Sequence, residues 1–95
     1  MSSGYLYILQ CADGSYYTGS TRDVQRRVNQ HQAGEGALYT RKRLPVRMVF
    51  VEEFPSIKEA FFREKQVQGW SRKKKEALIR GEYGKLPELA KSQKG

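Results

Sequence analysis

The sequence predicts one small domain of the α/β (α+β) class, in which a three-stranded sheet is flanked by helices in the order ββαβαα. An Asp13-Gly14 turn signal separates two apolar, β-prone runs, which indicates a hairpin. A basic helical segment follows that hairpin directly, and a third strand with a further helix start comes later. A length of 95 residues suits a single domain with a modest core.

The strands of the hairpin are expected at residues 5–11 and 16–20. Apolar side chains occupy both faces of the first strand, which predicts a central or well-covered strand. Tyr7 and Tyr17 then lie on neighbouring strands. Gly19 lies inside the second strand, where it costs stability, and it indicates either a bulge or a close approach of the backbone to a ligand.

The first helix carries two polar residues on the face that should be buried. Thr21 or Asp23 can cap this helix, which is expected to end near residues 29–32. Arg27 and His31 are four residues apart and fall on its apolar stripe. A buried arginine needs an anion, either a protein carboxylate or a bound phosphate. His31 is either a satisfied structural histidine or part of a proton relay.

A loop is expected from Gly34 to Pro45. It combines an aromatic residue with a basic run, a composition that suits contact with a nucleic-acid backbone. A solvated run of charges is the alternative interpretation. The residues concerned are Tyr39, Arg41, Lys42 and Arg43.

The third strand is expected at residues 46–53, and Ser56 with Glu59 forms a capping box that begins the second helix. Glu64 lies in the middle of the apolar stripe of that helix, a second charge on a face that should be buried. Two interpretations stay open: an internal salt bridge with Arg27, or a metal ligand at the floor of a cleft.

Ser71 can cap a third helix whose first turn holds four consecutive cations. Cations at that position oppose the helix dipole and one another, which favours a polyanionic partner. Trp70 is interpreted as a core anchor rather than a platform for base stacking. The domain is expected to cover residues 1–84, followed by a polar basic tail at 85–95. The four cations are Arg72, Lys73, Lys74 and Lys75.

The composition narrows the classes of partner. The formal net charge is +8 and the pI is near 9.8, which favours a polyanion, and nucleic acid is the commonest one. The single cysteine, Cys11, has no disulfide partner within the chain and is expected to be a small buried hydrophobe, in keeping with a cytoplasmic location. No signal peptide is visible, and no apolar run approaches the ~20 residues that span a membrane.

Several short motifs follow one another in a recognisable order. Tyr5-Leu6-Tyr7 lies on the first strand, Tyr17-Thr18-Gly19 on the second and Arg27 on the next helix, with Glu64 on a later helix. This ordered set resembles the GIY-YIG nuclease superfamily, in its small stand-alone single-domain bacterial type, over roughly residues 5–80. The sequence departs from that pattern at Tyr5, in place of a glycine. It also departs at Ser20 and Glu76, where relatives carry a lysine and an asparagine.

The resemblance implies a GIY-YIG-like fold and a divalent-metal-dependent endonuclease, a hydrolase that cleaves phosphodiester bonds in DNA. One Mg²⁺ or Mn²⁺ ion would be held by Glu64, and Arg27 would bind the scissile phosphate. The family site implies Tyr7 as general base and Tyr17 as its positioner, although the two roles could be exchanged. His31 would relay or orient the tyrosine proton.

DNA is the expected partner, with RNA as the alternative, and the protein is expected to act as a monomer or weak dimer. Arg22 and Arg26 extend the basic surface predicted for the loop and the third helix. A lone small domain favours selection of a DNA structure, as in repair or recombination, over a long sequence. The alternative functions are a non-catalytic nucleic-acid-binding module on the same basic face and an accessory protein of RNA particles.

Overall fold

The computed structural model describes residues 3–82, so the expected boundary at residue 84 and the tail at 85–95 lie outside the described residues. Within this range no helix is both long and apolar enough to cross a membrane. The elements, in chain order, are β1 (Gly4–Gln10), β2 (Tyr16–Thr21), α1 (Val24–Gln32), α2 (Leu38–Arg41), β3 (Arg47–Phe54), α3 (Ile57–Gln68) and α4 (Arg72–Ile79).

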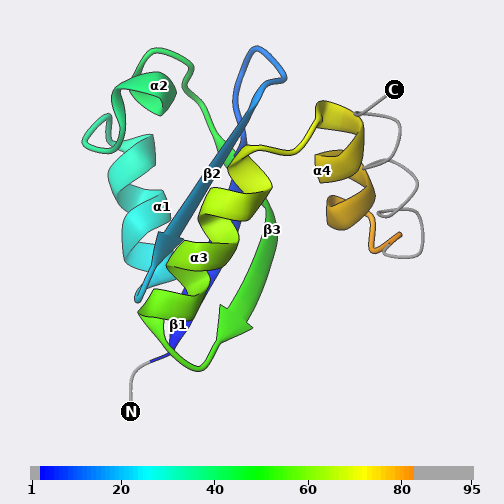
Figure 1. The fold of residues 1–95 in the computed structure, drawn as a ribbon. Helices are drawn as coiled ribbons and strands as arrows, with labels where there is room; N and C mark the ends of the chain where they lie inside the picture. The colour runs from blue at the N-terminus through cyan, green and yellow to red at the C-terminus, as the bar shows by residue number, and fades with distance from the viewer. Residues whose placement is uncertain (1–2, 83–95) are drawn as a thin grey trace.

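The three strands form one antiparallel sheet in the order β2-β1-β3 (Figure 1). The predicted fold class and the order ββαβαα are therefore confirmed, and β1 is the central strand as expected. The hairpin turns at Gly14, whose φ of 85° is a conformation that glycine adopts without steric cost. Tyr7 pairs with Gly19, and Leu9 pairs with Tyr17.

The two faces of the sheet have different covers. Helices α3 and α4 pack on one face, where Leu6 and Ile8 of β1 meet Val67 and Leu78 in a buried apolar cluster. Trp70 packs against this cluster, in agreement with its interpretation as an anchor. On the opposite face a second cluster surrounds the other side chains of β1, and Val28 of α1 packs against it. That cluster comprises Tyr7, Leu9, Cys11 and Val46.

Each main helix begins at a side chain that accepts a hydrogen bond from the first turn. Asp23, rather than Thr21, caps α1 by accepting from the backbone N–H of Arg26 at 3.0 Å. Ser56 caps α3 by accepting from the N–H of Glu59, so the predicted capping box is present. Ser71 caps α4 in the same way.

The segment predicted as an uninterrupted loop contains the short helix α2, and this part of the prediction was wrong. No side chain caps α2. Its stability comes from tertiary contact instead, because Thr40 is fully buried and its hydroxyl donates to the carbonyl oxygen of Ala37 at 3.0 Å. A single turn with no cap and no apolar period leaves no helix signal in the sequence.

Candidate active site

A chain of buried hydrogen bonds links β1, α1 and α2. The Tyr7 hydroxyl lies 3.0 Å from His31 Nε2, and His31 Nδ1 lies 2.7 Å from the Thr40 hydroxyl. All three side chains are buried, with at most 1% of each exposed. The sheet supplies the tyrosine, the apolar stripe of α1 supplies the histidine, and the short helix α2 supplies the threonine.

The hydrogen bond that Thr40 donates determines the tautomer of His31. Thr40 uses its only proton to donate to the Ala37 carbonyl, so its oxygen must accept from His31 Nδ1–H. His31 Nε2 then carries a lone pair and accepts from the Tyr7 hydroxyl. Burial, with a smaller contribution from Arg27, lowers the pKa of His31 below its ordinary 6.5, so the imidazole is neutral at pH 7. The arrangement draws the Tyr7 proton toward the histidine.

Two glycines leave room for these rings. A β-carbon at Gly19 would overlap the Tyr7 hydroxyl, and one at Gly36 would overlap the His31 ring. The pairing of β1 with β2 is in register at Gly19, so this residue is not a bulge. The close approach expected at Gly19 is present, and the group that approaches is the side chain of Tyr7.

A second tyrosine lies beside the histidine, and a third stacks on the second. The Tyr17 ring is 5.2 Å from the His31 ring and 6.4 Å from the Tyr7 ring, measured between centroids. Tyr39 stacks against Tyr17 with centroids 6.2 Å apart. Burial raises the pKa of Tyr17, and the nearby Glu64 carboxylate raises it further.

Arg27 faces the same cluster from α1. Its Nε is buried and has no hydrogen-bond partner within residues 3–82. Its guanidinium lowers the pKa of Tyr7, but burial outweighs it and holds that pKa well above the usual range for tyrosine. Arg27 therefore favours the Tyr7 phenolate, but desolvation dominates in this structure and Tyr7 is a neutral hydroxyl.

Glu64 reaches the cluster from α3 and is 9% exposed. Its Oε1 accepts from the Ser20 hydroxyl at 2.5 Å, and its Oε2 accepts from Gln68 Nε2 at 2.6 Å. Its one ion pair among the described residues is with Lys65, at 3.9 Å. The alternative of an internal salt bridge between Glu64 and Arg27 is thus wrong, since no ion pair joins them among the described residues.

A cleft of about 670 Å³ lies between α1 and α3 at the end of β2. Arginines line the side formed by α1, whereas Ile57 and Phe61 make the side formed by α3 apolar. Glu64 and Ser20 also line the cleft, so the carboxylate faces a strongly cationic space. The arginines in the cleft wall are Arg22, Arg26 and Arg27.

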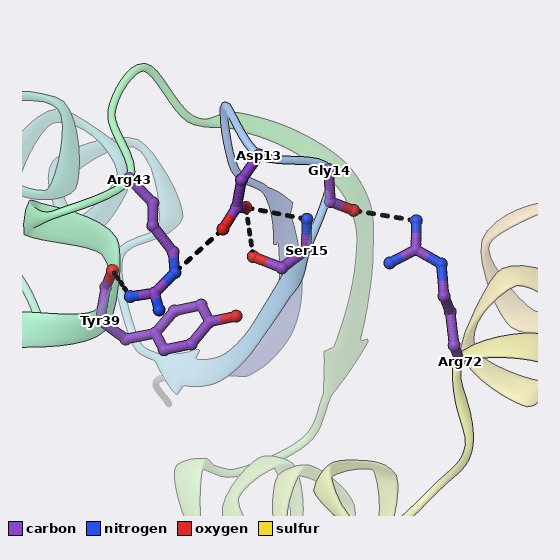
Figure 2. A network of polar contacts seen from close by, with 6 residues as sticks. All are labelled: Asp13, Gly14, Ser15, Tyr39, Arg43 and Arg72. Atoms are coloured by element: carbon purple, nitrogen blue, oxygen red, sulfur yellow. Dashed lines mark hydrogen bonds and ion pairs between the residues drawn. The ribbon is translucent and has the colours of Figure 1, made fainter.

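The remaining predicted contacts for nucleic acid lie elsewhere on the surface, and two of them are occupied within the protein (Figure 2). Arg43 donates to Asp13 Oδ2 at 3.1 Å and to the Tyr39 carbonyl oxygen at 3.0 Å, and its guanidinium lies over the Tyr39 ring. Arg72 donates to the Gly14 carbonyl oxygen at 2.9 Å. The other members of the two basic runs lie outside the cluster formed by Tyr7, Tyr17, Arg27, His31 and Glu64: they are Arg41, Lys42, Lys73, Lys74 and Lys75.

The donor set around Glu64 fits one hard divalent cation. A carboxylate has about four acceptor sites, and the hydrogen bonds from Ser20 and Gln68 use two of them. Within residues 3–82 no group of three or more His, Cys, Asp or Glu side chains could form a protein cage for a metal. Magnesium at sites of this kind takes one or two carboxylates and completes its shell with water and substrate oxygens.

Sequence reasoning missed three residues of this site. Thr40 lies in a segment without a helix signal, so nothing in the sequence directs it toward His31. Ser20 was noted only as a departure from a family lysine. Gln68 was the one with a usable signal, since it follows Glu64 by four residues and therefore lies on the same helical face.

Comparison with known proteins gives a consistent picture. Residues 3–77 match the family model described as the GIY-YIG catalytic domain. A UPF0213 protein of Natronomonas pharaonis is 51% identical over 80 residues, which cover 84% of this chain and 94% of that protein. A UPF0213 protein of Halobacterium salinarum is 53% identical over 75 residues, which cover 79% of this chain and 97% of that protein.

Two solution NMR structures share the fold. That of a UPF0213 protein from Bacillus halodurans has 51% sequence identity and a TM-score of 0.54, and the match covers 82% of this chain and 83% of that one. That of a protein from E. faecalis has 38% identity and a TM-score of 0.59, with 87% and 88% of the two chains covered. The similarity thus extends over most of each protein.

Proposed function

The chain belongs to the GIY-YIG family, whose members are nucleases, and on this premise we propose that it is a divalent-metal-dependent endonuclease that hydrolyses phosphodiester bonds in DNA. The observation that carries the proposal is the buried hydrogen-bond chain from Tyr7 through His31 to Thr40. It leaves a neutral imidazole ready to accept the tyrosine proton, beside an arginine whose Nε has no hydrogen-bond partner in the described part of the chain.

The proposed reaction begins with a water molecule in the cleft. As its oxygen attacks phosphorus, its proton passes to the Tyr7 oxygen, and the Tyr7 proton passes to His31 Nε2. The imidazolium that forms keeps its hydrogen bond to Thr40. The bond from phosphorus to the leaving oxygen breaks, and that oxygen takes up a proton from solvent water. Because Tyr7 need not exist as a free phenolate, its raised pKa is compatible with this role.

Arg27 is proposed to bind the scissile phosphate. Its planar guanidinium presents several donors that match the non-bridging oxygens, and its Nε has no hydrogen-bond partner within residues 3–82. The fixed positive charge would stabilise the additional negative charge of the transition state. Tyr17, which lies next to both Tyr7 and His31, would position the attacking water or exchange roles with Tyr7.

Glu64 is proposed to hold the cation, either Mg²⁺ or Mn²⁺, with Ser20 and Gln68 fixing the carboxylate orientation. When bound, such an ion would neutralise charge on the phosphate and on the leaving oxygen. The carboxylate also separates this function from the second candidate, a non-catalytic binding module. A carboxylate inside an arginine-lined cleft weakens plain binding of a polyanion, whereas a metal site requires it.

The substrate preference proposed here is for DNA of a particular structure, as in repair or recombination, acted on in the cytoplasm by a monomer or weak dimer. Support comes from the size of the protein, since one small domain with an open cleft offers few contacts for reading a long sequence. RNA is the alternative substrate, and cleavage of it would leave the same residues in the same roles.

The test is a cleavage assay on labelled single-stranded, duplex, flapped and branched DNA and on RNA, with Mg²⁺, with Mn²⁺ and with chelator. Glu64→Gln keeps the size and shape of the side chain and removes its negative charge. We expect cleavage to fall by about a thousandfold in this variant while DNA binding persists, and we expect Mn²⁺ to raise the melting temperature of the parent alone. Tight binding with no cleavage under any metal would establish the binding module instead.

A further inference from the structure

A second pocket, of about 250 Å³, opens beside the catalytic cluster at the first half of β2. Two of its residues also belong to the catalytic cluster. Tyr17 packs on His31, and Gln68 donates to the Glu64 carboxylate. The pocket therefore adjoins the site already described, on the side away from the arginine-lined cleft. Its lining residues are Tyr16, Tyr17, Thr18, Tyr39, Gln68 and Lys75.

Lys75 places a positive charge in this pocket without a neighbouring negative charge, among the described residues, to pair with it. Within residues 3–82 its ammonium group has no hydrogen bond and no ion pair, whereas Arg72 of the same helix pairs with Glu76 at 3.2 Å. Lys74 is also engaged, over the Trp70 ring at 4.1 Å. Lys75 is partly buried, and burial lowers its pKa. A partly desolvated cation without a counter-ion is unfavourable unless an anion comes from outside the chain.

The walls of the pocket offer polar as well as aromatic groups. Thr18 is 4% exposed, and its hydroxyl oxygen is one of the few buried side-chain atoms in the described residues without a hydrogen-bond partner. The stacked rings of Tyr17 and Tyr39 also line the pocket. A cation beside tyrosine rings suits a phosphate with the sugar and base attached to it.

The position of the pocket along β2 indicates how a substrate would run. The cleft is lined by residues 20–23 at one end of the strand, and the pocket by residues 16–18 at the other. Three residues of a strand span about 10 Å, so an extended chain of nucleotides can reach both. We propose that this pocket binds a second phosphate of the substrate strand, near the scissile one, with Lys75 as its cation. The inference rests on the proposed function and extends it.

The test compares Lys75→Gln with Lys73→Gln, which removes the same charge from an exposed position in the same helical turn. Both changes are made in the Glu64→Gln background, with chelator present, so that no substrate is cut. Affinity for a fluorescein-labelled oligothymidylate is measured by anisotropy, and thermal unfolding checks that both variants are folded. We expect Lys75→Gln to weaken binding about tenfold and Lys73→Gln by about twofold or less.

Equal losses of affinity in the two variants would overturn the proposal that this pocket binds a phosphate, while nucleic-acid binding itself would still be established. If the Glu64→Gln parent binds no oligonucleotide, the proposed function fails and takes this inference with it. A second measurement places single neutral methylphosphonate linkages along the oligonucleotide in turn. A methylphosphonate at one linkage should weaken binding to the parent. The same substitution should have no further effect on binding to Lys75→Gln, because the cation that contacts this phosphate is already absent. A loss that is the same in both proteins at every linkage would contradict the assignment.

Discussion

The two faces of strand β1 pack against different kinds of side chain, although the residues of the two faces alternate along the same seven-residue strand. Leu6 and Ile8 point into a cluster made of aliphatic groups under α3 and α4. Tyr7, one residue away, points into a cluster with a histidine, an arginine and a second tyrosine. The first face contributes burial of apolar surface, and the second contributes a fixed arrangement of donors and acceptors.

This difference shows how a small domain can accommodate a costly polar site. A buried hydroxyl, imidazole and guanidinium are tolerated on one side because the other side of the same strand is closed and apolar. Central placement in the sheet also fixes Tyr7 through backbone pairing with both β2 and β3. Changes on the two faces should therefore affect different measurements.

The largest expected effect is on the polar face. Tyr7→Phe keeps the ring and removes the hydroxyl, so the water loses its proton acceptor while packing is preserved. We expect the cleavage rate to fall by about a thousandfold, and the free energy of unfolding to fall by about 1 to 3 kcal/mol because His31 Nε2 loses its buried partner. Single-turnover cleavage and denaturant unfolding measure the two. A variant that cleaves normally would transfer the role of base to Tyr17.

The apolar face should give the reverse result. Leu6 is completely buried, and Leu6→Ala leaves a cavity between β1 and the helices. We expect the free energy of unfolding to fall by about 3 kcal/mol, while cleavage per folded molecule stays within about twofold of the parent. The check is urea unfolding beside cleavage at low temperature. A large loss of cleavage in protein that is still folded would show that the two faces are not independent.

The smallest expected effect is the dependence of stability on pH. His31 has a folded-state pKa below its ordinary 6.5, so the unfolded chain binds more protons than the folded one between these two values. Stability should therefore be complete above pH 6.5 and decline as the pH falls through the folded pKa. His31→Gln should abolish this decline, which unfolding at several pH values measures.

Thr40→Val should keep the decline but lower the free energy of unfolding by about 1 to 3 kcal/mol, because His31 Nδ1–H is left without an acceptor. Denaturant unfolding at pH 7.5 measures the loss.

Most of the strands, the hairpin turn and the helix starts could be predicted, because each depends on residues that are neighbours in the sequence. The Asp13-Gly14 turn, the caps at Ser56 and Ser71, and the apolar strands each depend on neighbouring residues. The same holds for Arg27 and His31, which a helical period places on one face. Helix α2 and the contact of Thr40 with His31 could not be predicted, because they depend on segments that meet only after folding. The raised pKa of Tyr7 could not be predicted for a related reason: the sequence shows the nearby charge but not the depth of burial.

The hairpin turn connects two segments that line the second pocket. Asp13 holds Arg43 across 30 residues of sequence, and Gly14 holds Arg72 across 58 (Figure 2). Arg43 belongs to the segment that carries Tyr39, and Arg72 begins the helix that carries Lys75. The segment that carries Tyr39 and the helix that carries Lys75 are thus both tied to the hairpin turn. The turn joins two segments that line the second pocket, although Asp13 and Gly14 do not line it themselves.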